Sequence, residues 1–353
     1  MLKDYKGACH IHTEYSDDTS IQIPDVITSA QAAGLDFVIL SDHNTFLPKS
    51  DGWEGWHDNL LVVIGMEVSP IHDGHFLTLD SKPLADSKYI DIKNYINMPS
   101  VECIEEVLVS GGSVYPVHPL GKKKWSFVVN VEAWRNWEHT GFAGIEIWTY
   151  MHDWIDDLKL SNLWHFYKNP NLQIKGPDPE LLSIWDKLGQ ERKVVGISGL
   201  DAHYREIPII KKPLFTYEEL FKTIRTHILV EHELSKSDDA VRLVCDAHKE
   251  GRCYVSFDLL VDATGFSFTA ESGGNIYFMG DEVCDVQKEL RFYIKSPHYA
   301  NIKLLRNGKI LKELEGDFLE FSSTEKGVYR VEAYIENRPW VFTNPIYIRE
   351  YSS

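Results

Sequence analysis

The sequence is poor in thiols and has no cysteine arrangement that would build a structural metal site or a disulfide framework. Its five cysteines are odd in number and scattered, and no two of them form a CxxC pair. Zinc knuckles and small secreted disulfide scaffolds are therefore excluded as classes. We expect reduced and mostly buried thiols.

Long apolar runs are also absent, so the sequence predicts no membrane-spanning helix. The first seven residues are polar and lack the apolar segment of a secretory signal, which makes the cytoplasm the expected location. Apolar residues make up 43% of the chain and charged residues 25%, the balance of a folded globular protein. The length of 353 residues predicts two domains.

Positive charge is scarce, because 36 Lys and Arg residues stand against 53 Asp and Glu residues, a formal net charge of −17. Such a surface repels a nucleic-acid backbone, so non-specific binding of DNA or RNA is disfavoured. A site that holds several divalent cations needs carboxylates, and part of the excess can belong to such a site. The charge is compatible with a small phosphorylated substrate.

Two common signatures of other enzyme classes are missing as well. The segment from Gly196 to Leu200 lacks the GxSxG spacing of a nucleophile elbow, so serine-type catalysis is not predicted. No glycine-rich phosphate loop follows any expected strand, so the sequence indicates no nucleotide cofactor.

Residues 7 to about 258 alternate short apolar runs with amphipathic stretches. The apolar runs cover 37–40, 60–64 and 194–197, and the expected helices cover 24–33, 100–110, 179–190, 217–226 and 238–250. Repeated strand–helix units predict an α/β fold with a mostly parallel sheet, either open or closed into a barrel.

Beyond about residue 260 the pattern changes to that of short strands. The expected strands cover 290–295, 302–306, 309–314, 328–335 and 340–348. Asn307-Gly308 is a strong two-residue hairpin turn, and a second hairpin is expected around Glu336 to Pro339. The sequence thus predicts a domain of residues 1–258 and a small all-β, sandwich-like domain of residues 259–353.

Imidazole and carboxylate side chains recur at the ends of the expected strands. His10 and His12 are spaced to share one face of a strand, and Asp17 lies in the loop just beyond. The others follow further apolar runs and are Asp42, His43, Glu67, His118, Asp201 and His203. Functional groups of parallel α/β folds gather at the carboxyl ends of strands, so we expect these side chains to form one site.

The mixture of imidazole with carboxylate suits Zn²⁺, Mn²⁺ or Fe²⁺. Eight or nine such ligands exceed the need of one ion, so the sequence predicts two or three divalent ions. Glu67 is the expected bridging carboxylate. Closely spaced ions lower the pKa of a shared water molecule and bind both the attacking and the leaving oxygen of a hydrolysis.

The order of these motifs resembles that of the polymerase and histidinol phosphatase (PHP) family, over roughly residues 7 to 258. The resemblance implies a distorted seven-stranded (βα)7 barrel and a trinuclear site that hydrolyses phosphate esters. It implies one ion at His10, His12, Glu67 and Asp201, a second at Glu67, His75 and His118, and a third at Asp17, His43 and His203. His72 is the alternative to His75, and Asp18 is the alternative to Asp17.

The end of the chain adds a narrower resemblance. Residues 329–332 and 339–347 are similar to the end of the carbaryl-hydrolase-type branch of this family, often called CehA/McbA-like. Its members pair a PHP barrel with a small β domain, and some are described as esterases or carbamate hydrolases.

The favoured hypothesis is a metal-dependent phosphoesterase that cleaves a small phosphate ester through a metal-bridging hydroxide. Glu67, Asp201 and His203 are the expected catalytic residues. One alternative is a carboxylic-ester or carbamate hydrolase that uses the same site. The other is a non-catalytic binding protein that holds metal. The sequence does not predict an oligomeric state.

Several further residues have both a functional and a structural interpretation. Lys122 and Glu146 are candidate substrate-binding residues, although a solvated lysine loop and a satisfied buried carboxylate are the structural alternatives. Asp42 either orients a metal ligand or caps its loop. Seven of the ten tryptophans lie between residues 125 and 185, where they serve either substrate stacking or packing. His152 has no placement that distinguishes it from an ordinary histidine.

Overall fold

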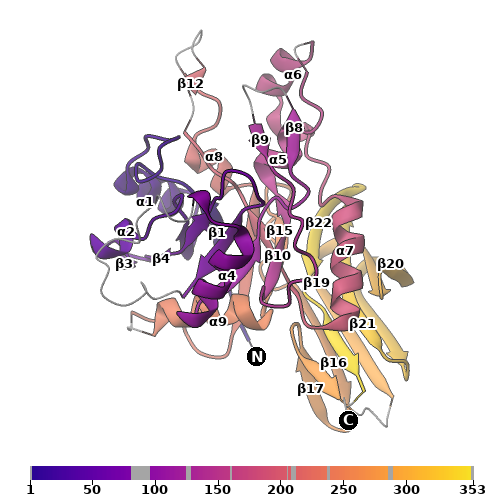
Figure 1. The fold of residues 1–353 in the computed structure, drawn as a ribbon. Coiled ribbons are helices and arrows are strands. Elements are labelled where there is room, and N and C mark those ends of the chain that lie inside the picture. Colours follow the sequence, from indigo (N-terminus) through magenta and orange to yellow (C-terminus); the bar gives the residue numbers. More distant parts are fainter. Residues whose placement is uncertain are drawn as a thin grey trace.

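The computed structural model describes residues 2–80, 96–124, 129–159, 161–204, 206–207, 212–236, 239–284 and 289–350. It is a mixed α/β fold with one large sheet and few helices (Figure 1). Within this described part, no helix combines the length and the apolar character needed to cross a membrane.

The first strands form the parallel part of the large sheet. β1 (Lys3–Ile11) pairs in parallel with β2 (Phe37–Leu40), and β2 pairs in parallel with β4 (Leu60–Ile64). Every residue of β2 and β4 is buried, as expected for strands that are covered on both faces. β3 (Gly55–His57) pairs antiparallel with β4 at the edge of the sheet.

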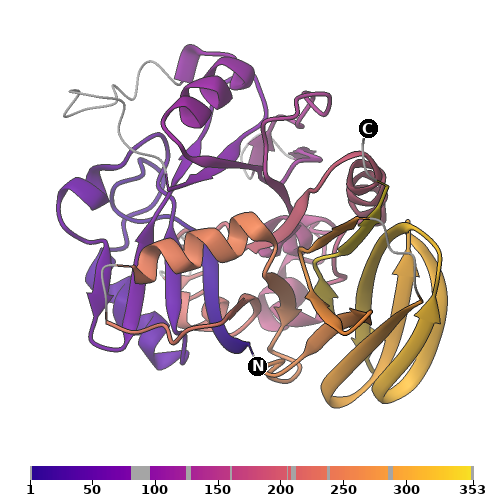
Figure 2. The same ribbon diagram turned by 90° about the horizontal axis from the view of Figure 1, so that it is seen from below.

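Two amphipathic helices cover these strands from opposite faces. Side chains such as Val38 and Val62 share a core with α1 (Ile23–Ala32), whereas their neighbours Phe37 and Leu61 share a core with α9 (Ala240–Glu250). This alternation follows from the two-residue period of a strand. Figure 2 shows α9 lying across the strands.

Other described strands among the first 258 residues form smaller sheets, and most of the described helices there are short. β5 (Met66–Val68), β6 (Phe76–Leu79) and β7 (Ser113–Pro116) form an antiparallel sheet, and β10 (Gly144–Thr149) pairs in parallel with β11 (Val195–Gly199). Two short pairs are β8 (Lys122–Lys124) with β9 (Val129–Val131) and β12 (Glu206–Ile207) with β13 (Lys212–Pro213). The helices are α2 (Leu47–Ser50), α4 (Ser100–Val109), α5 (Tyr150–Ile155), α6 (Leu163–Lys168), η1 (Pro170–Leu172), α7 (Pro179–Glu191) and α8 (Tyr217–Phe221).

The structure does not show the closed (βα)7 barrel that the family resemblance implied. Its strands fall into separate sheets, and β14 (Ile224–Val230) runs antiparallel to both β1 and β15 (Cys253–Phe257). The prediction of one helix over 217–226 is wrong in its second half, because the chain enters β14 at Ile224. β14 is rich in β-branched residues, which favour a strand.

Beyond β15 the described chain contains strands joined by turns and no helix, as the sequence predicted. They are β16 (Ser267–Ser272), β17 (Asn275–Phe278), β18 (Glu282–Cys284), β19 (Leu290–Arg306), β20 (Lys309–Ser323), β21 (Gly327–Ile335), β22 (Arg338–Thr343) and β23 (Ile346–Arg349). The two strands expected over 290–306 are one continuous strand, β19. Asn307 and Gly308 have φ values of 51° and 76°, which confirms the hairpin turn between β19 and β20.

The large sheet continues past residue 258. β15 pairs antiparallel with β22, in a register that places Val255 opposite Phe342, so main-chain hydrogen bonds join the two parts of the chain. In Figure 2 the C-terminal strands gather at one side of the molecule. The division into domains of residues 1–258 and 259–353 stays a prediction.

A buried histidine in β14 makes the stability of the fold depend on pH. His227 contacts Asp4 Oδ1 through Nδ1 at 2.9 Å and Asp258 Oδ2 through Nε2 at 3.2 Å. Burial by itself would lower the pKa of His227, but the hydrogen bonds to Asp258 and Asp4 outweigh it and raise the pKa to about 9. The protonated imidazole therefore stabilises the folded state.

Because the folded pKa lies above the ordinary value, this stabilisation is complete below about pH 6.5 and is lost as the pH rises through about 9. The loss is on the order of 3 kcal/mol, since a tenfold change in a protonation equilibrium is worth about 1.4 kcal/mol. Urea unfolding at pH 6, 8 and 10 should show this decline in the wild type and a flatter profile in His227→Gln. His232→Gln, an exposed control, should keep the wild-type slope. A wild-type slope in His227→Gln would contradict the assignment.

Candidate metal centre

The side chains singled out in the sequence come together where strands end. His10 lies near the end of β1, His43 follows β2, His118 follows β7, and Asp201 follows β11. Glu67 is in β5, and a bridge between His43 and Glu67 links the two segments. The structure thus brings this set of predicted residues together, and their role as one functional site stays a prediction.

Three of these residues have left-handed backbone conformations, which are rare outside glycine. The φ values are 61° at His10, 32° at His118 and 54° at Asp201. At His10 the strand register shifts between Ala8 and Ile11, so a bulge, and not regular strand alternation, turns His10 and His12 towards the same carboxylate. Strained backbone of this kind concentrates at functional sites.

Glu67 lies among five imidazole rings and is 1% exposed. Its Oε1 atom is 2.9 Å from Nδ1 of His75 and 3.1 Å from Nε2 of His118. The Oε2 atom lies near the other three rings, at 3.0 Å from His43 Nδ1, 3.3 Å from His12 Nε2 and 3.4 Å from His10 Nε2. One carboxylate thus connects two sets of imidazoles, as the bridging role predicted for Glu67 requires.

Asp201 faces the same rings from the other side. Its Oδ1 atom is 3.5 Å from Nε2 of both His10 and His12, and its Oδ2 atom is 3.4 Å from Nε2 of His152. His152 also stacks on His118, with ring centroids 4.5 Å apart. The sequence analysis missed His152, and its position three residues beyond the end of β10 was the signal that could have found it.

Among the described residues, four overlapping groups have the spacing to hold an ion. They are His10–His12–Glu67, Glu67–His75–His118, His12–Asp18–His43–His203 and His118–His152–Asp201. A fifth group, His227–Asp258–Asp262, lies apart, and there the imidazole already contacts Asp4 and Asp258. The second group contains His75 and not its alternative His72.

The structure places Asp18, and not Asp17, against the imidazoles of the third group. Asp18 Oδ2 is 2.8 Å from His203 Nε2 and 3.8 Å from His43 Nε2. Asp17 is exposed and lines a neighbouring hollow of about 430 Å³ together with His43 and His75. The preference for Asp17, which came from the family resemblance, is therefore corrected to Asp18.

Substitution of the adjacent residues Asp17 and Asp18 gives a matched test of which carboxylate binds an ion. Asp18→Asn should remove the ion of the group with His43 and His203, because an amide supplies no negative charge to hold a cation. We expect the metal content per chain, measured by mass spectrometry, to fall by about one ion, and the affinity for added Mn²⁺ to fall by about 10- to 100-fold. Asp17→Asn should leave both quantities near the wild-type level. The reverse pattern would restore Asp17 as the ligand.

Glu146 lies behind the candidate ligands and is fully buried. Its Oε1 atom is 2.8 Å from His10 Nδ1, and its Oε2 atom accepts hydrogen bonds from the His118 backbone N–H, at 2.8 Å, and from the Thr149 hydroxyl. Substrate cannot reach a carboxylate enclosed in this way, so the structure makes Glu146 a residue that orients His10 and not a substrate-binding residue.

The close approach of Glu146 to His10 requires a glycine in β11. A Cβ atom at Gly199 would overlap Glu146 Oε1 and would lie 2.7 Å from His10 Cβ. Gly199 therefore leaves the space in which the carboxylate and the imidazole meet.

Asp42 fixes the turn that follows His12. It accepts hydrogen bonds from the Thr13 backbone N–H at 2.6 Å, the Thr13 hydroxyl at 2.7 Å and the Ser16 hydroxyl at 2.7 Å. The Ser16 oxygen is in turn 3.3 Å from His12 Nδ1. Of the two roles considered for Asp42, the structure shows the cap of the loop, and this turn carries the Ser16 hydroxyl beside His12. The orientation of a metal ligand by Asp42 stays a prediction.

Burial and neighbouring charges set the protonation of the cluster. Burial would raise the pKa of Glu67, but His43 and His10 outweigh it and hold the pKa well below its ordinary value. Burial and the neighbouring His152 lower the pKa of His118 to about 4. Glu67 is thus ionised and His118 neutral at pH 7. The carboxylates around His10 and His43 outweigh burial and raise the pKa of both rings, to about 10 for His43, so an ion that binds there has to displace a proton from each ring.

Two buried nitrogen atoms in the middle of the histidine cluster indicate whether divalent ions fit there. In the described part of the chain, Nε2 of His10 and Nε2 of His12 are buried and make no hydrogen bond. Buried polar atoms are rarely left in this state, and each costs about 1–3 kcal/mol. Both atoms point at the carboxylates of Glu67 and Asp201, so a divalent cation would satisfy all four side chains.

The structure does not describe the whole candidate site. Lys122 begins β8, but its side chain lies outside the described part of the chain. Its role in substrate binding therefore stays a prediction.

Comparisons with known proteins reveal only distant likenesses. No family model matches the sequence, and no curated protein matches it. The structure is similar to that of PsfC from Pseudomonas syringae, with 11% sequence identity over 69% of this chain and 96% of the other, and a TM-score of 0.42. It is also similar to a protein of Bifidobacterium adolescentis named as a candidate metal-dependent phosphoesterase, with 14% identity, 57% and 89% coverage and a TM-score of 0.37.

A third similar structure is an amidohydrolase from Chromobacterium violaceum with bound sulfate. The identity is 13%, the match covers 61% of this chain and 95% of the other, and the TM-score is 0.33. Similarities with TM-scores this low do not assign a function to the chain. A functional assignment has to come from the side chains of the candidate metal centre.

Proposed function

We propose that the protein is a metal-dependent hydrolase that cleaves a small phosphate ester at a centre of two or three divalent ions. The observation that carries this proposal is the position of Glu67 among five imidazoles, with Asp201 on the other side of His10 and His12. A bridging carboxylate with imidazoles on both of its oxygen atoms is suited to adjacent Zn²⁺, Mn²⁺ or Fe²⁺ ions.

Bound ions would supply an activated water molecule and would neutralise the charge that develops on the ester oxygens. The chain itself supplies the geometry. Glu146 holds His10 through Nδ1, so that Nε2 of that ring faces Glu67 and Asp201. His203 is held in a similar way, since its Nδ1 lies 3.0 Å from the backbone oxygen of Asp201. These fixed orientations reduce the reorganisation needed in the transition state.

The ligands divide into groups that would hold separate ions. His10, His12 and Glu67 with Asp201 would hold one ion, and Glu67 with His75 and His118 a second. Asp18, His43 and His203 would hold a third. His152 could complete the sphere of the second ion or of a separate one, because it lies between His118 and Asp201.

A carboxylic ester or carbamate is the second candidate substrate. One observation favours it: Lys175, the described lysine beside the hollow next to His118, is paired with Asp156 and Asp157, so its charge is not available to attract a phosphate. The resemblance of the chain's end to the CehA/McbA-like branch points the same way. Membership in the PHP family and in that branch is part of this proposal.

The test combines metal content with a matched pair of substrates. Wild type and a His10→Ala/His12→Ala variant are loaded with Mn²⁺, Zn²⁺ or Fe²⁺ and assayed on 4-nitrophenyl phosphate and 4-nitrophenyl acetate. Two or three ions per chain, lost together with phosphatase activity in the variant, would support the proposal. Bound ions with esterase activity alone would favour the second candidate. A chain that binds no ion under any loading condition would overturn both.

A further inference from the structure

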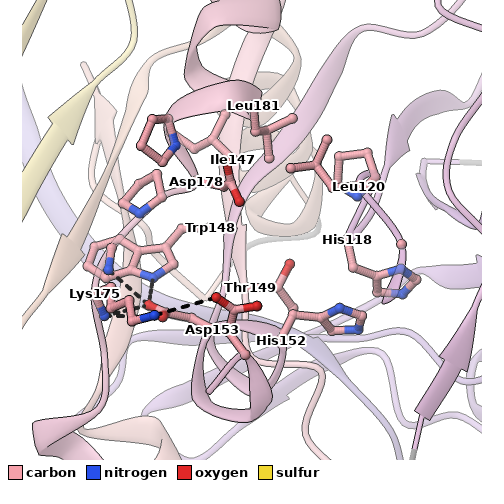
Figure 3. A pocket seen from close by; sticks show the side chains of 16 residues that line it. His118, Leu120, Ile147, Trp148, Thr149, His152, Asp153, Lys175, Asp178 and Leu181 are labelled. Atoms are coloured by element: carbon pink, nitrogen blue, oxygen red, sulfur yellow. Dashed lines mark hydrogen bonds and ion pairs between the residues drawn. The ribbon is translucent and has the colours of Figure 1, made fainter. Parts of the chain in front are cut away.

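A hollow of about 380 Å³ opens directly beside the candidate metal centre, within the size range of small-molecule sites. His118 and His152, which belong to the group with Asp201, form one of its walls. Figure 3 shows these two imidazoles on one side of the hollow and the side chains of Trp148 and Lys175 on the other. A substrate whose reacting group lies at the metal centre would therefore extend into this hollow, here called the Trp148 hollow.

The Trp148 hollow has a mostly apolar lining. Leu120, Ile147, Trp148 and Leu181 contribute apolar side chains, and proline rings complete the surface. An apolar surface beside a polar centre favours a group without hydrogen-bonding partners, because burial of that group removes apolar area from water.

The charge around the hollow is negative once the ion pairs are considered. Among the described lining residues other than histidines, Lys175 has the one basic side chain, and it is paired with Asp156 and Asp157. Asp153 and Asp178 also line the hollow, and they accept hydrogen bonds from backbone N–H groups of Lys175, Gly176 and Glu180. These surroundings repel a second phosphate on the substrate.

The wall is held in place by contacts that do not involve a ligand. Asp153 accepts a hydrogen bond from Trp148 Nε1 at 3.0 Å and thereby fixes the indole against the loop at Gly176. The far edge of the indole packs against Phe342 of β22, with ring centroids 5.8 Å apart. The hollow is thus formed before any substrate binds, which lowers the entropic cost of binding.

On the basis of the proposed function, we propose that the Trp148 hollow binds the leaving group of the ester and selects an uncharged, apolar alcohol. Esters of benzyl or cyclohexyl alcohol belong to this class, whereas sugars and nucleosides that carry further phosphates do not. The same selection applies to a phosphate ester and to a carboxylic ester, because the hollow receives the alcohol and not the acid.

The first measurement compares kcat/KM for esters of one acid with different alcohols. Benzyl esters should exceed glycerol esters by about 10²-fold, and a glycerol ester that carries a second phosphate should be the poorest substrate. A preference for the doubly phosphorylated ester would overturn the inference and leave the proposed function intact.

The second measurement uses matched variants of α7. Leu181→Trp fills the hollow and should lower kcat/KM for the benzyl ester at least about 10-fold while changing the methyl ester less than about twofold. Ser183→Trp introduces the same side chain at an exposed position of the same helix and should behave as the wild type. Leu120→Asn, a polar replacement of similar size, is a second variant of the hollow and should also lower the benzyl rate. The test therefore does not depend on whether Leu181→Trp folds. Equal benzyl rates in wild type and both hollow variants would overturn the inference.

Binding without reaction separates this inference from the proposed function. Benzyl alcohol should give a saturation-transfer NMR signal with the wild type and with Ser183→Trp, and a weaker one with Leu181→Trp. If no ester is hydrolysed but this pattern is found, the proposed hydrolase function fails and the apolar site stands. If esters are hydrolysed but benzyl alcohol binds equally to all three proteins, the assignment of the hollow fails.

Discussion

Glu67→Gln is expected to remove the two ions that Glu67 would hold and to lower kcat/KM by on the order of 10⁴-fold, the scale seen when one member of a catalytic unit is removed. The carboxylate lies within 3.4 Å of nitrogen atoms from five histidines, so one substitution affects both sides of the centre. The amide keeps the shape of the side chain and removes its charge. The loss can therefore be attributed to cation binding and not to a cavity.

The measurement is metal content per chain by mass spectrometry, together with steady-state hydrolysis of the best ester. Glu102→Gln, at an exposed position of α4, is the matched control and should retain both properties. A Glu67→Gln protein that keeps its ions and its activity would show that Glu67 does not bridge. A protein that keeps its ions but loses all activity would place Glu67 in the reaction and outside the ligand set.

Arg330→Met should lower the free energy of unfolding by about 3–5 kcal/mol, the range for removal of one partner of a buried ion pair. The guanidinium is 2% exposed and bonds Asp186 of α7 through two parallel contacts, Nε to Oδ1 at 2.6 Å and Nη2 to Oδ2 at 2.7 Å. A third contact joins Nη1 to Glu332 at 2.6 Å. Removal of the arginine leaves two carboxylates without their cation.

Urea unfolding of the metal-free protein measures this effect without a contribution from bound ions. Arg242→Met is the control, because Arg242 pairs with Asp239 at the surface and its side chain is 64% exposed, so the change should stay within about 0.5 kcal/mol. Addition of Asp186→Leu to Arg330→Met should recover part of the loss, since it removes one of the uncompensated charges. A loss below about 1 kcal/mol in Arg330→Met would show that the pair does not hold α7 on β21.

Much of the candidate metal centre could be predicted from the sequence because it depends on local order along the chain. Glu67, His118 and Asp201 follow apolar runs, and His10 and His12 have the alternate spacing of a strand; these segments contain strands in the structure. β1 and β2 are a parallel pair, as are β10 and β11, and parallel strands place their carboxyl ends on one side, which explains why His10, His43 and Asp201 meet. Glu67 and His118 belong to the antiparallel sheet of β5, β6 and β7, so the parallel-strand rule does not account for their place. The all-β end of the chain and the Asn307-Gly308 turn were predictable for a similar reason, since strand alternation and turn chemistry are short-range properties.

The remaining features depend on contacts between distant segments. The resemblance to the PHP family favoured Asp17, but in the structure it is Asp18 that lies beside the rings of His43 and His203. His152 joins the cluster only because α5 brings it beside His118. No local pattern distinguishes such neighbours, because the choice is made by where side chains of other elements point.

The difference between local patterns and long-range contacts also applies to the secondary structure and to the way in which its elements assemble. The sequence by itself indicated several of the strands, the main helices and the chemistry of the ligand set, because these depend on periodicity and residue type along the chain. Only the tertiary structure decided that β14 runs antiparallel to β1, that β15 pairs with β22 and that Glu146 faces His10. These arrangements join residues that are far apart in the sequence, such as Gly7 opposite Thr226, and their energies come from packing and hydrogen bonds that exist only after the chain has folded.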